Sequence, residues 1–252
     1  MTLHLDIRSN RAGRSEPGPG PPTSSVDGPL YPVGLVVRGR RCLVVGGGRV
    51  AARKVRSLLE CGASVTIVAP DVHEAVRLLV EDRTPEPHED PPLDVQRRRY
   101  ERGEAAGYRL VIAATGDPDV DAAVYEDAET AGVWVNSADD PTHCSMMLPA
   151  VWRTGTVTVS VSTDGTSPAL ASWLRTRFAE SVGEHVGELA TLLGEARRRL
   201  QDEDRPTDSV DWLAILEGPV PVLVAEGRLA DARAALGEAI GAVVGPPGSS
   251  NS

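Results

Sequence analysis

The stretch RCLVVGGGRVAARKVRSLLECGASVTIVAP, residues 41–70, decides the fold of this chain. Its first five residues are a short apolar run that predicts a buried strand, and Gly46, Gly47 and Gly48 follow directly. A helical apolar pattern comes next and ends at Gly62, a residue type that terminates helices. Residues 64–69 predict a second strand. A strand, a glycine turn, a helix and a strand are the context that a dinucleotide fingerprint requires.

The glycines of this turn have distinct expected roles. Gly46 allows a tight turn, Gly48 allows a pyrophosphate to approach the backbone, and Ala51 allows close packing of helix and strand. The helix that follows presents unpaired N–H groups and a favourable dipole to phosphates. Nucleotide binding is therefore the favoured interpretation, and a purely structural glycine turn is the alternative.

The end of the second strand bears on the choice of dinucleotide. Ala69 and Pro70 occupy the place where an acidic residue usually binds the ribose, and Asp71 follows one step later. Asp71 is expected to reach the ribose hydroxyls or, alternatively, to be a residue at the start of the next helix. This part of the sequence contains no arginine to receive a 2′-phosphate, so the sequence favours NAD over NADP.

Strand and helix signals keep alternating as far as residue 136. Further strands are predicted at 94–100, 109–114 and 133–136, and further helices at 72–80 and 117–131. Such alternation predicts an α/β fold, a Rossmann-like parallel sheet with helices on both faces. Residues 83–92 are rich in proline and charge and are expected to form a solvated loop.

The pattern changes after residue 144. Residues 145–152 and 156–163 predict a hairpin, and Ser167 followed by Pro168 predicts a helix start. Helical patterns cover 168–180, 184–203 and 228–241. The predicted organisation is a disordered tail (1–29), a Rossmann-like NAD-binding domain (30–144), a hairpin dimerisation region (145–167), a helical domain (168–244) and a second disordered tail (245–252). A hairpin edge and a helical region this poor in aromatic residues are expected to need a partner, which predicts a homodimer.

The composition excludes several classes of protein. The formal net charge of −10 argues against non-specific nucleic-acid binding, which needs clustered cations. No apolar run reaches about 18 residues, so no membrane span is expected. The amino terminus lacks the pattern of a signal peptide, and three cysteines show neither zinc spacing nor a paired motif. A cytoplasmic location is expected.

Four strings taken together resemble one family. VVGGGRVAARKVRSLLECGASVTIVAP is followed, in order, by VIAATGDPDVD (111–121), VNSADDP (135–141) and VSTDGTSPALASWLR (161–175). The chain resembles the precorrin-2 dehydrogenase and sirohydrochlorin ferrochelatase family, which includes the amino-terminal module of siroheme synthases and stand-alone relatives. The resemblance covers about residues 30 to 205. It implies NAD-dependent oxidation of precorrin-2 to sirohydrochlorin in siroheme or other modified tetrapyrrole biosynthesis, by a homodimer.

The resemblance also implies site residues. The expected catalytic residue is Asp139. The expected cofactor contacts are Gly46, Gly48, Arg49, Val50, Pro70, Asp71 and Thr115. The expected contacts to precorrin-2, an anionic tetrapyrrole, are Ser162, Thr163, Thr166, Ser167 and Arg175, the last through its preference for carboxylates. Asp164 stands where the family pattern has glycine, and it adds a negative charge beside a site expected to hold a polycarboxylate.

Several interpretations stay open at this stage. Without the resemblance, Asp139 reads equally well as a turn or cap residue. His143 and Cys144 are potential metal ligands, but two adjacent residues make a poor metal site, so loop packing is favoured and no metal is predicted. The alternative functions are a dehydrogenase that also inserts ferrous iron, and a regulatory module that senses NAD without chemistry.

Overall fold

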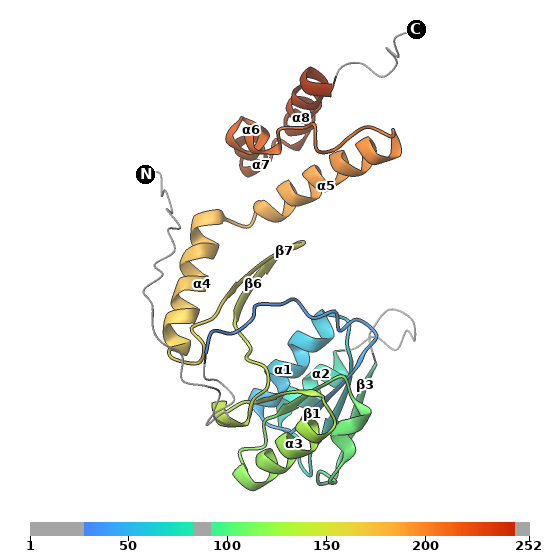
Figure 1. The fold of residues 1–252 in the computed structure, drawn as a ribbon, viewed down its shortest axis with the longest axis vertical. Helices are drawn as coiled ribbons and strands as arrows, with labels where there is room; N and C mark the ends of the chain where they lie inside the picture. The colour runs from blue at the N-terminus through green and yellow to red at the C-terminus, as the bar shows by residue number, and fades with distance from the viewer. Residues whose placement is uncertain (1–27, 83–91, 245–252) are drawn as a thin grey trace, which may run out of the picture. The chain divides into compact units, whose positions relative to one another are not determined.

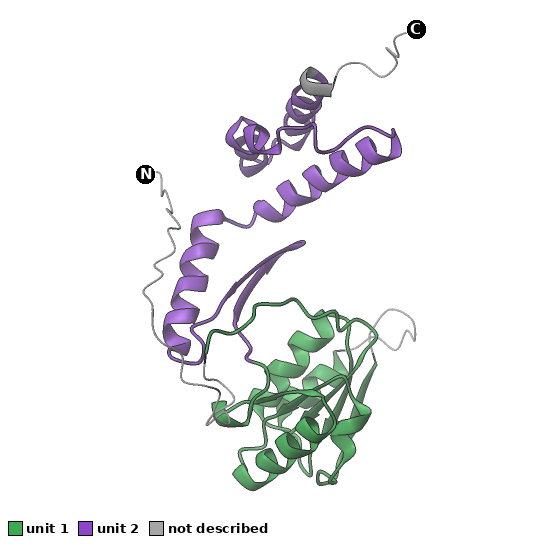
Figure 2. Cartoon of the chain, viewed as in Figure 1, with its two compact units in different colours: residues 1–146 green, residues 147–252 purple. Residues whose placement is uncertain are grey.

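The computed structural model describes residues 28–82 and 92–244 (Figure 1). The two predicted tails and the predicted loop at 83–92 lie outside the described residues, apart from residues 28, 29 and 92. The chain divides into two compact units, residues 1–146 and 147–252 (Figure 2). Each unit is described by itself.

Unit 1 contains a five-stranded parallel sheet in the order β3-β2-β1-β4-β5. The strands are β1 (Arg41–Val45), β2 (Ser64–Val68), β3 (Leu93–Gln96), β4 (Leu110–Ala113) and β5 (Trp134–Ser137). This order confirms the predicted Rossmann-like sheet. The third strand was predicted to reach residue 100 but ends at Gln96. Arg98 turns its guanidinium back onto the side chains of Gln96 and Glu104, which draws the chain out of the sheet.

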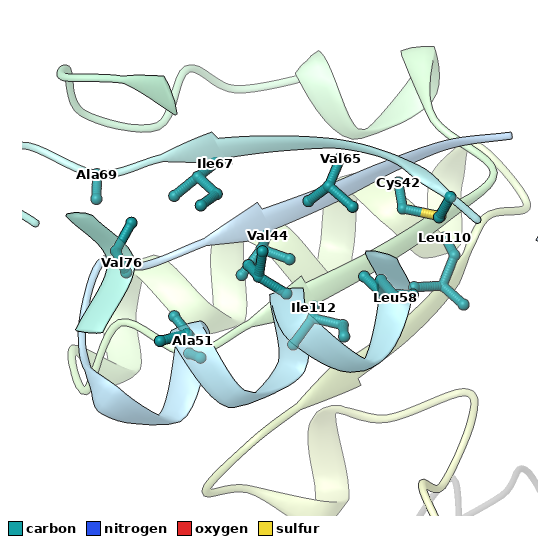
Figure 3. Close-up of a cluster of buried hydrophobic side chains, with 14 of the residues drawn as sticks. Cys42, Val44, Ala51, Leu58, Val65, Ile67, Ala69, Val76, Leu110 and Ile112 are labelled. Carbon is teal, nitrogen blue, oxygen red and sulfur yellow. The ribbon is translucent and has the colours of Figure 1, made fainter. Parts of the chain in front are cut away.

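Helices cover both faces of this sheet. Helices α1 (Arg49–Glu60) and α2 (Glu74–Glu81) pack on one face, and α3 (Pro118–Thr130) and the short 3-10 helix η1 (Glu104–Gly107) pack on the other. Because side chains alternate along a strand, β1 serves both layers. Cys42 and Val44 face α1, as Figure 3 shows, and Leu43 and Val45 face α3. Burial on both faces explains the continuous apolar run that the sequence shows.

Unit 2 begins with an antiparallel hairpin formed by β6 (Ala150–Thr154) and β7 (Val157–Val161). Its first strand was predicted to start at residue 145, which is wrong. The backbone N–H groups of Ser145 and Met146 donate to the carbonyl of Val135 and so bind this segment to β5 instead. Helix α4 (Pro168–Val182) contacts both strands of the hairpin.

Four more helices complete unit 2: α5 (Val186–Asp202), α6 (Trp212–Glu217), α7 (Val220–Ala225) and α8 (Leu229–Val244). Their buried side chains form a separate core that includes Leu192, Ile215 and Leu236. The sequence reading missed α6 and α7, which have six residues each and are too short for a clear period. In residues 28–82 and 92–244, no helix combines the length and the apolar character needed to cross a membrane.

Candidate functional site

Three neighbouring strand ends form one edge of the sheet in unit 1. β1, β4 and β5 are adjacent and parallel, so their carboxyl ends lie together. Ala113 pairs with Ser137, and the backbone N–H of Ala138 continues the ladder by donating to the carbonyl of Ala113 at 2.8 Å. Thr115 and Asp139, each two residues beyond that pair, are therefore neighbours. Open α/β sheets bind ligands at this edge.

The glycine turn follows β1 at the same edge. A side chain on Gly46, whose φ is 123°, would place Cβ only 2.1 Å from the carbonyl oxygen of Ala114. Gly47, which the sequence reading did not single out, is equally confined by the carbonyl oxygen of Asp71, also at 2.1 Å. A Cβ on Gly48 would meet nothing within 4 Å, and this residue caps α1 without a side-chain hydrogen bond. The turn is thus tightly packed at Gly46 and Gly47 and open to solvent at Gly48.

The segment after β2 is tied to this turn. The backbone N–H of His73 donates to the carbonyl of Gly47 at 2.8 Å, and Pro70 and Asp71 are exposed beside it. The side chain of Arg49, the first residue of α1, lies here too, with its Nε 3.2 Å from Nε2 of His73. The segment after β2 contains no arginine of its own, as the sequence shows. The arginine comes from the neighbouring helix, 24 residues earlier in the chain.

Thr115 does not present a free hydroxyl. Its Oγ1 donates to Oδ1 of Asp121 at 2.7 Å and accepts from the backbone N–H of Asp117 at 3.0 Å. Because the backbone N–H of Thr115 also donates to Asp121 at 3.3 Å, the predicted cofactor contact at Thr115 is left to its carbonyl and methyl groups. Asp121 was missed by the sequence reading, although it shares a helix face with the buried Val124 and Ala128. An acidic residue on the apolar face of a predicted helix is a sequence signal that could have identified Asp121 as a buried carboxylate.

Asp121 is a buried carboxylate, 5% exposed. Burial raises its pKa, whereas the hydrogen bonds from the hydroxyl and the N–H of Thr115 lower it. The negative charge of Asp139 raises the pKa of Asp121 further, which shows that the two carboxylates interact. Two acidic groups therefore lie near this edge of the sheet, Asp121 enclosed on α3 and Asp139 exposed after β5.

A buried thiol holds the loop that carries Asp139. Sγ of Cys144 accepts from the backbone N–H of Ser137 at 3.2 Å and from the side-chain amide of Asn136 at 3.4 Å. Burial raises the pKa of this thiol. His143 pairs with Asp140 at 2.8 Å and its ring lies against that of Tyr125. These contacts support loop packing for His143 and Cys144, and no group of three or more potential metal ligands occurs in the described part of the chain.

Lys54, the single lysine of the chain, belongs to the same neighbourhood. It is half-buried on α1, and burial lowers the pKa of its ammonium group, with a further decrease from Arg53. Cys144 and Asp139 act in the opposite direction, so the charge of Lys54 interacts with the Asp139 loop. The carboxylate of Asp139 is exposed and makes no hydrogen bond or ion pair to any described residue. It is available to a ligand.

The expected substrate residues lie in unit 2, around the loop between β7 and α4. Oγ of Ser167 caps α4 by accepting from the N–H of Leu170 at 3.3 Å, and its own N–H donates to Oγ1 of Thr163 at 3.1 Å. Ser162 donates to Asp164 at 3.2 Å, while Thr166 is exposed. Sequence reasoning did not foresee that these hydroxyl groups also build the loop itself.

Asp164 and Arg175 are two further polar residues of this region. Asp164 has a φ of 49°, so it adopts the left-handed conformation that glycine favours and that aspartate tolerates. The backbone course therefore does not depend on glycine at this position. Arg175 donates from Nη2 to Thr176 at 3.1 Å, whereas its Nε is buried without a partner among the described residues. That donor is unsatisfied and can still bind an acceptor.

The sheet order, the glycine turn after β1 and the polar groups at the adjoining strand ends define a dinucleotide-binding domain of the doubly wound α/β class. Residues 33–150 match the family described as "Putative NAD(P)-binding". Siroheme synthase from Methylococcus capsulatus is 39% identical over 82% of this chain and 43% of its own length. Siroheme synthase from Acinetobacter baylyi is 34% identical over 76% of this chain and 41% of its own length.

This chain belongs to the siroheme synthase family. It spans less than half the length of the siroheme synthases that it matches. A solved structure named "SirC, precorrin-2 dehydrogenase" superimposes with a TM-score of 0.63, covering 84% of this chain and 99% of that one at 23% identity. At that identity, the likeness supports the fold and its hairpin and helical parts.

Proposed function

We propose that this chain is an NAD-dependent precorrin-2 dehydrogenase, which removes two hydrogens from precorrin-2 to give sirohydrochlorin. The observation that carries the proposal is the edge of the sheet in unit 1. There the glycine turn, Thr115 and the exposed carboxylate of Asp139 follow three adjacent parallel strands. The relatives named siroheme synthase and precorrin-2 dehydrogenase support the choice of substrate.

The turn fits a bound dinucleotide. Gly48 leaves open space where a side chain would stand, and the first N–H groups of α1 point out of the helix without a side-chain cap. Gly46 and Gly48 would let the pyrophosphate approach, and Arg49 and Val50 follow in the first turn of α1. Pro70 and Asp71 would adjoin the adenosine ribose. Bound NAD supplies the hydride acceptor.

Asp139 is proposed to accept the proton that leaves precorrin-2 when the hydride departs. Its carboxylate is exposed and uncommitted, so it can take a proton at Oδ1 or Oδ2. The thiol of Cys144 keeps the loop in place by accepting from the N–H of Ser137, two residues before Asp139. Lys54 adds a positive charge in the same neighbourhood, and its own pKa responds to the charge of Asp139.

We propose that the loop before α4 and Arg175 bind the carboxylates of precorrin-2. Thr166 is exposed, and Arg175 retains a buried, unpartnered Nε donor. A guanidinium group is suited to carboxylates because it offers paired donors. Ser162, Thr163 and Ser167 are proposed to contribute hydroxyl or backbone groups while they maintain the loop.

The test uses a pair of neighbouring carboxylates. Asp139→Asn should bind NAD as tightly as the wild type and lower the rate of precorrin-2 oxidation by about 100-fold or more, the usual contribution of a general base. Asp140→Asn is the matched control, because the amide oxygen can still accept from the N–H of Thr142. NADH formation, followed by absorbance with ferrous iron omitted, measures the reaction. The same assay with iron added tests the iron-inserting alternative.

Two outcomes would contradict this proposal. An Asp139→Asn variant with an unchanged rate would remove the role of Asp139. A wild-type chain that binds NAD and does not oxidise precorrin-2 would favour the sensing module over the enzyme.

We also propose that the chain forms a homodimer through unit 2. Both strands of the hairpin are only half-buried, and α4 exposes Leu170, Trp173 and Phe178. Aromatic side chains of this kind often dominate protein interfaces. Trp173→Glu should lower the affinity between protomers by at least about tenfold in light scattering. Leu213→Glu, at an equally exposed site on α6, should leave it unchanged. A monomeric wild type at micromolar concentration would refute the dimer.

A further inference from the structure

Lys54 is a half-buried cation at the border of the packed face of α1. Residues three and four positions apart share a helix face, and both Ala51 and Leu58 are buried in the core against the sheet. The neighbouring cations on the same helix, Arg53 and Arg56, are exposed. Lys54 is therefore drawn towards the sheet, whereas the two arginines point into solvent.

The loop that carries Asp139 borders the same layer of the molecule. Ala138 directly precedes Asp139, and Met146 lies beyond the far end of the loop. Both side chains pack against the core cluster that α1 shares with the sheet. The thiol of Cys144 holds the loop to β5 by accepting from the backbone N–H of Ser137. Both ends of the loop thus lie on the side of the sheet that α1 covers.

The charges of the helix and the loop interact. Burial and Arg53 lower the pKa of the Lys54 ammonium group, whereas the negative charges of Cys144 and Asp139 raise it. In turn, the positive charge of Lys54 lowers the pKa of Cys144, against the larger effect of burial. Charges further apart than about 10 Å are largely screened in physiological salt. The ammonium group therefore lies close to the loop, as the packing of Ala138 and Met146 indicates.

The ammonium group of Lys54 nevertheless has no partner in the part of the chain that the structure describes, since it makes no hydrogen bond or ion pair there. Partial removal of a cation from water costs free energy unless an anion or a set of acceptors compensates for it. An anionic ligand that supplies this partner would bind favourably. The ammonium offers three donors on a flexible stem, which suits a carboxylate that approaches from outside.

The edge of the sheet beside Lys54 is otherwise rich in acidic side chains. Asp117 and Asp121 follow β4, and Asp139 and Asp140 follow β5. A ligand with several carboxylates, such as the proposed substrate, meets like charges there. A cation next to Asp139 offsets this repulsion, so the place of Lys54 complements the charge of the ligand.

We propose that Lys54 binds a carboxylate group of precorrin-2 and so places the tetrapyrrole beside Asp139. The inference rests on the proposed function, because it takes the tetrapyrrole as the ligand at this edge. It adds a substrate-binding cation from unit 1 to the residues proposed from unit 2.

The experiment measures binding of uroporphyrin to the full chain through the fluorescence of the porphyrin. Uroporphyrin carries the acetate and propionate side chains of precorrin-2 and is already fully oxidised, so it reports binding without turnover. Lys54→Met keeps the apolar stem and should weaken binding about tenfold, as expected for the loss of one charge-assisted hydrogen bond. Lys54→Arg keeps the charge and should retain most of the affinity.

Three controls separate a contact from an effect on folding or on net charge. Arg56→Met removes an exposed cation from the same helix and should bind uroporphyrin as the wild type does. Added salt should weaken binding to the wild type more steeply than binding to Lys54→Met, because salt screens an ionic contact. The affinity for NAD and the melting temperature should not fall in Lys54→Met, since the change removes a half-buried charge without a described partner.

A second measurement uses the reaction itself. Lys54→Met should raise the KM for precorrin-2 about tenfold with little change in kcat, because the contact is made in the bound substrate as well as in the transition state. This measurement decides the matter if the wild type oxidises precorrin-2 and does not retain uroporphyrin.

Three results would overturn the role of Lys54. They are unchanged uroporphyrin affinity and KM in Lys54→Met, an equal loss of affinity in Arg56→Met, and weaker NAD binding in Lys54→Met, which would place the ammonium against the cofactor. The failure of the proposed function looks different, because the wild type would then neither bind uroporphyrin nor oxidise precorrin-2.

Discussion

The parallel sheet of unit 1 and the hairpin of unit 2 differ in how far their side chains are buried. β1 and β4 lie at the centre of the parallel sheet in unit 1, and nearly every side chain along them is buried. In the hairpin of unit 2, no residue of β6 or β7 is buried. The first structure carries a complete core in one chain. The second leaves its faces half-open, which is the state expected of a surface that another molecule covers.

Polar burial differs in the same way. The buried polar side chains among the described residues are Asp121, Asn136 and Ser137, and all three belong to unit 1 near the carboxyl edge of its sheet. Burying polar groups costs free energy, so their concentration at one edge of the sheet is typical of a functional site.

The largest contrast is expected between two glycines with positive φ. Gly46→Ala would place Cβ 2.1 Å from a backbone oxygen and should destabilise unit 1 by roughly 3–5 kcal/mol through strain and overpacking. Gly165→Ala should cost about 1 kcal/mol, because its Cβ would meet only the flexible end of Met147. Urea unfolding of both variants measures the difference. Similar losses would mean that the two turns are equally constrained.

A pair of valines tests the burial contrast itself. Val111→Ala removes the two methyl groups of a fully buried side chain on β4 and should cost about 2–3 kcal/mol, for the transfer of two carbons plus a cavity. Val159→Ala on β7 should cost less than about 1 kcal/mol when the protein is dilute, since the side chain is only half-buried. Hydrogen exchange resolved by segment reports each unit separately.

Val159→Ala is expected to destabilise the protein more at high protein concentration. That result would show that a second copy covers the hairpin. A cost that is large at every concentration would instead indicate that the hairpin is buried within its own chain.

The smallest effect concerns the enclosed carboxylate. Because burial raises the pKa of Asp121, the folded protein holds this proton more firmly than the unfolded chain. Stability from this group is therefore present at low pH and is lost as the pH rises through the folded pKa. Asp121→Asn should flatten this decrease and change stability at neutral pH by less than about 1 kcal/mol, since the amide oxygen can still accept from Thr115. Chemical unfolding across acidic and neutral pH checks the slope.

Much of unit 1 was predictable from sequence, and the reasons are local. The apolar run at Arg41–Val45, the glycines after it and the stop at Gly62 each have one strong physical interpretation, and the structure confirms all three. The place of Asp139 beside Thr115 followed from the parallel order of strands. These features depend on residues that are close in the chain or on a regular topology.

The missed features depend on contacts between distant residues. Arg49 meets His73 across a whole helix and strand, so no local pattern at residue 71 reveals it. The hydroxyl of Thr115 is engaged by a hydrogen bond to the side chain of Asp121, a contact that the sequence alone does not reveal. The first hairpin strand was placed too early because Ser145 has an alternative partner in β5.

The presence of a single lysine has a practical consequence. An amine-directed acylating reagent has one side chain to modify, Lys54, in addition to the terminal amine. That side chain is half-buried on α1, close enough to the loop of Asp139 for their charges to interact. The extent of acylation at Lys54, measured by mass spectrometry, therefore reports whether a ligand occupies the edge of the sheet. No engineered probe is needed.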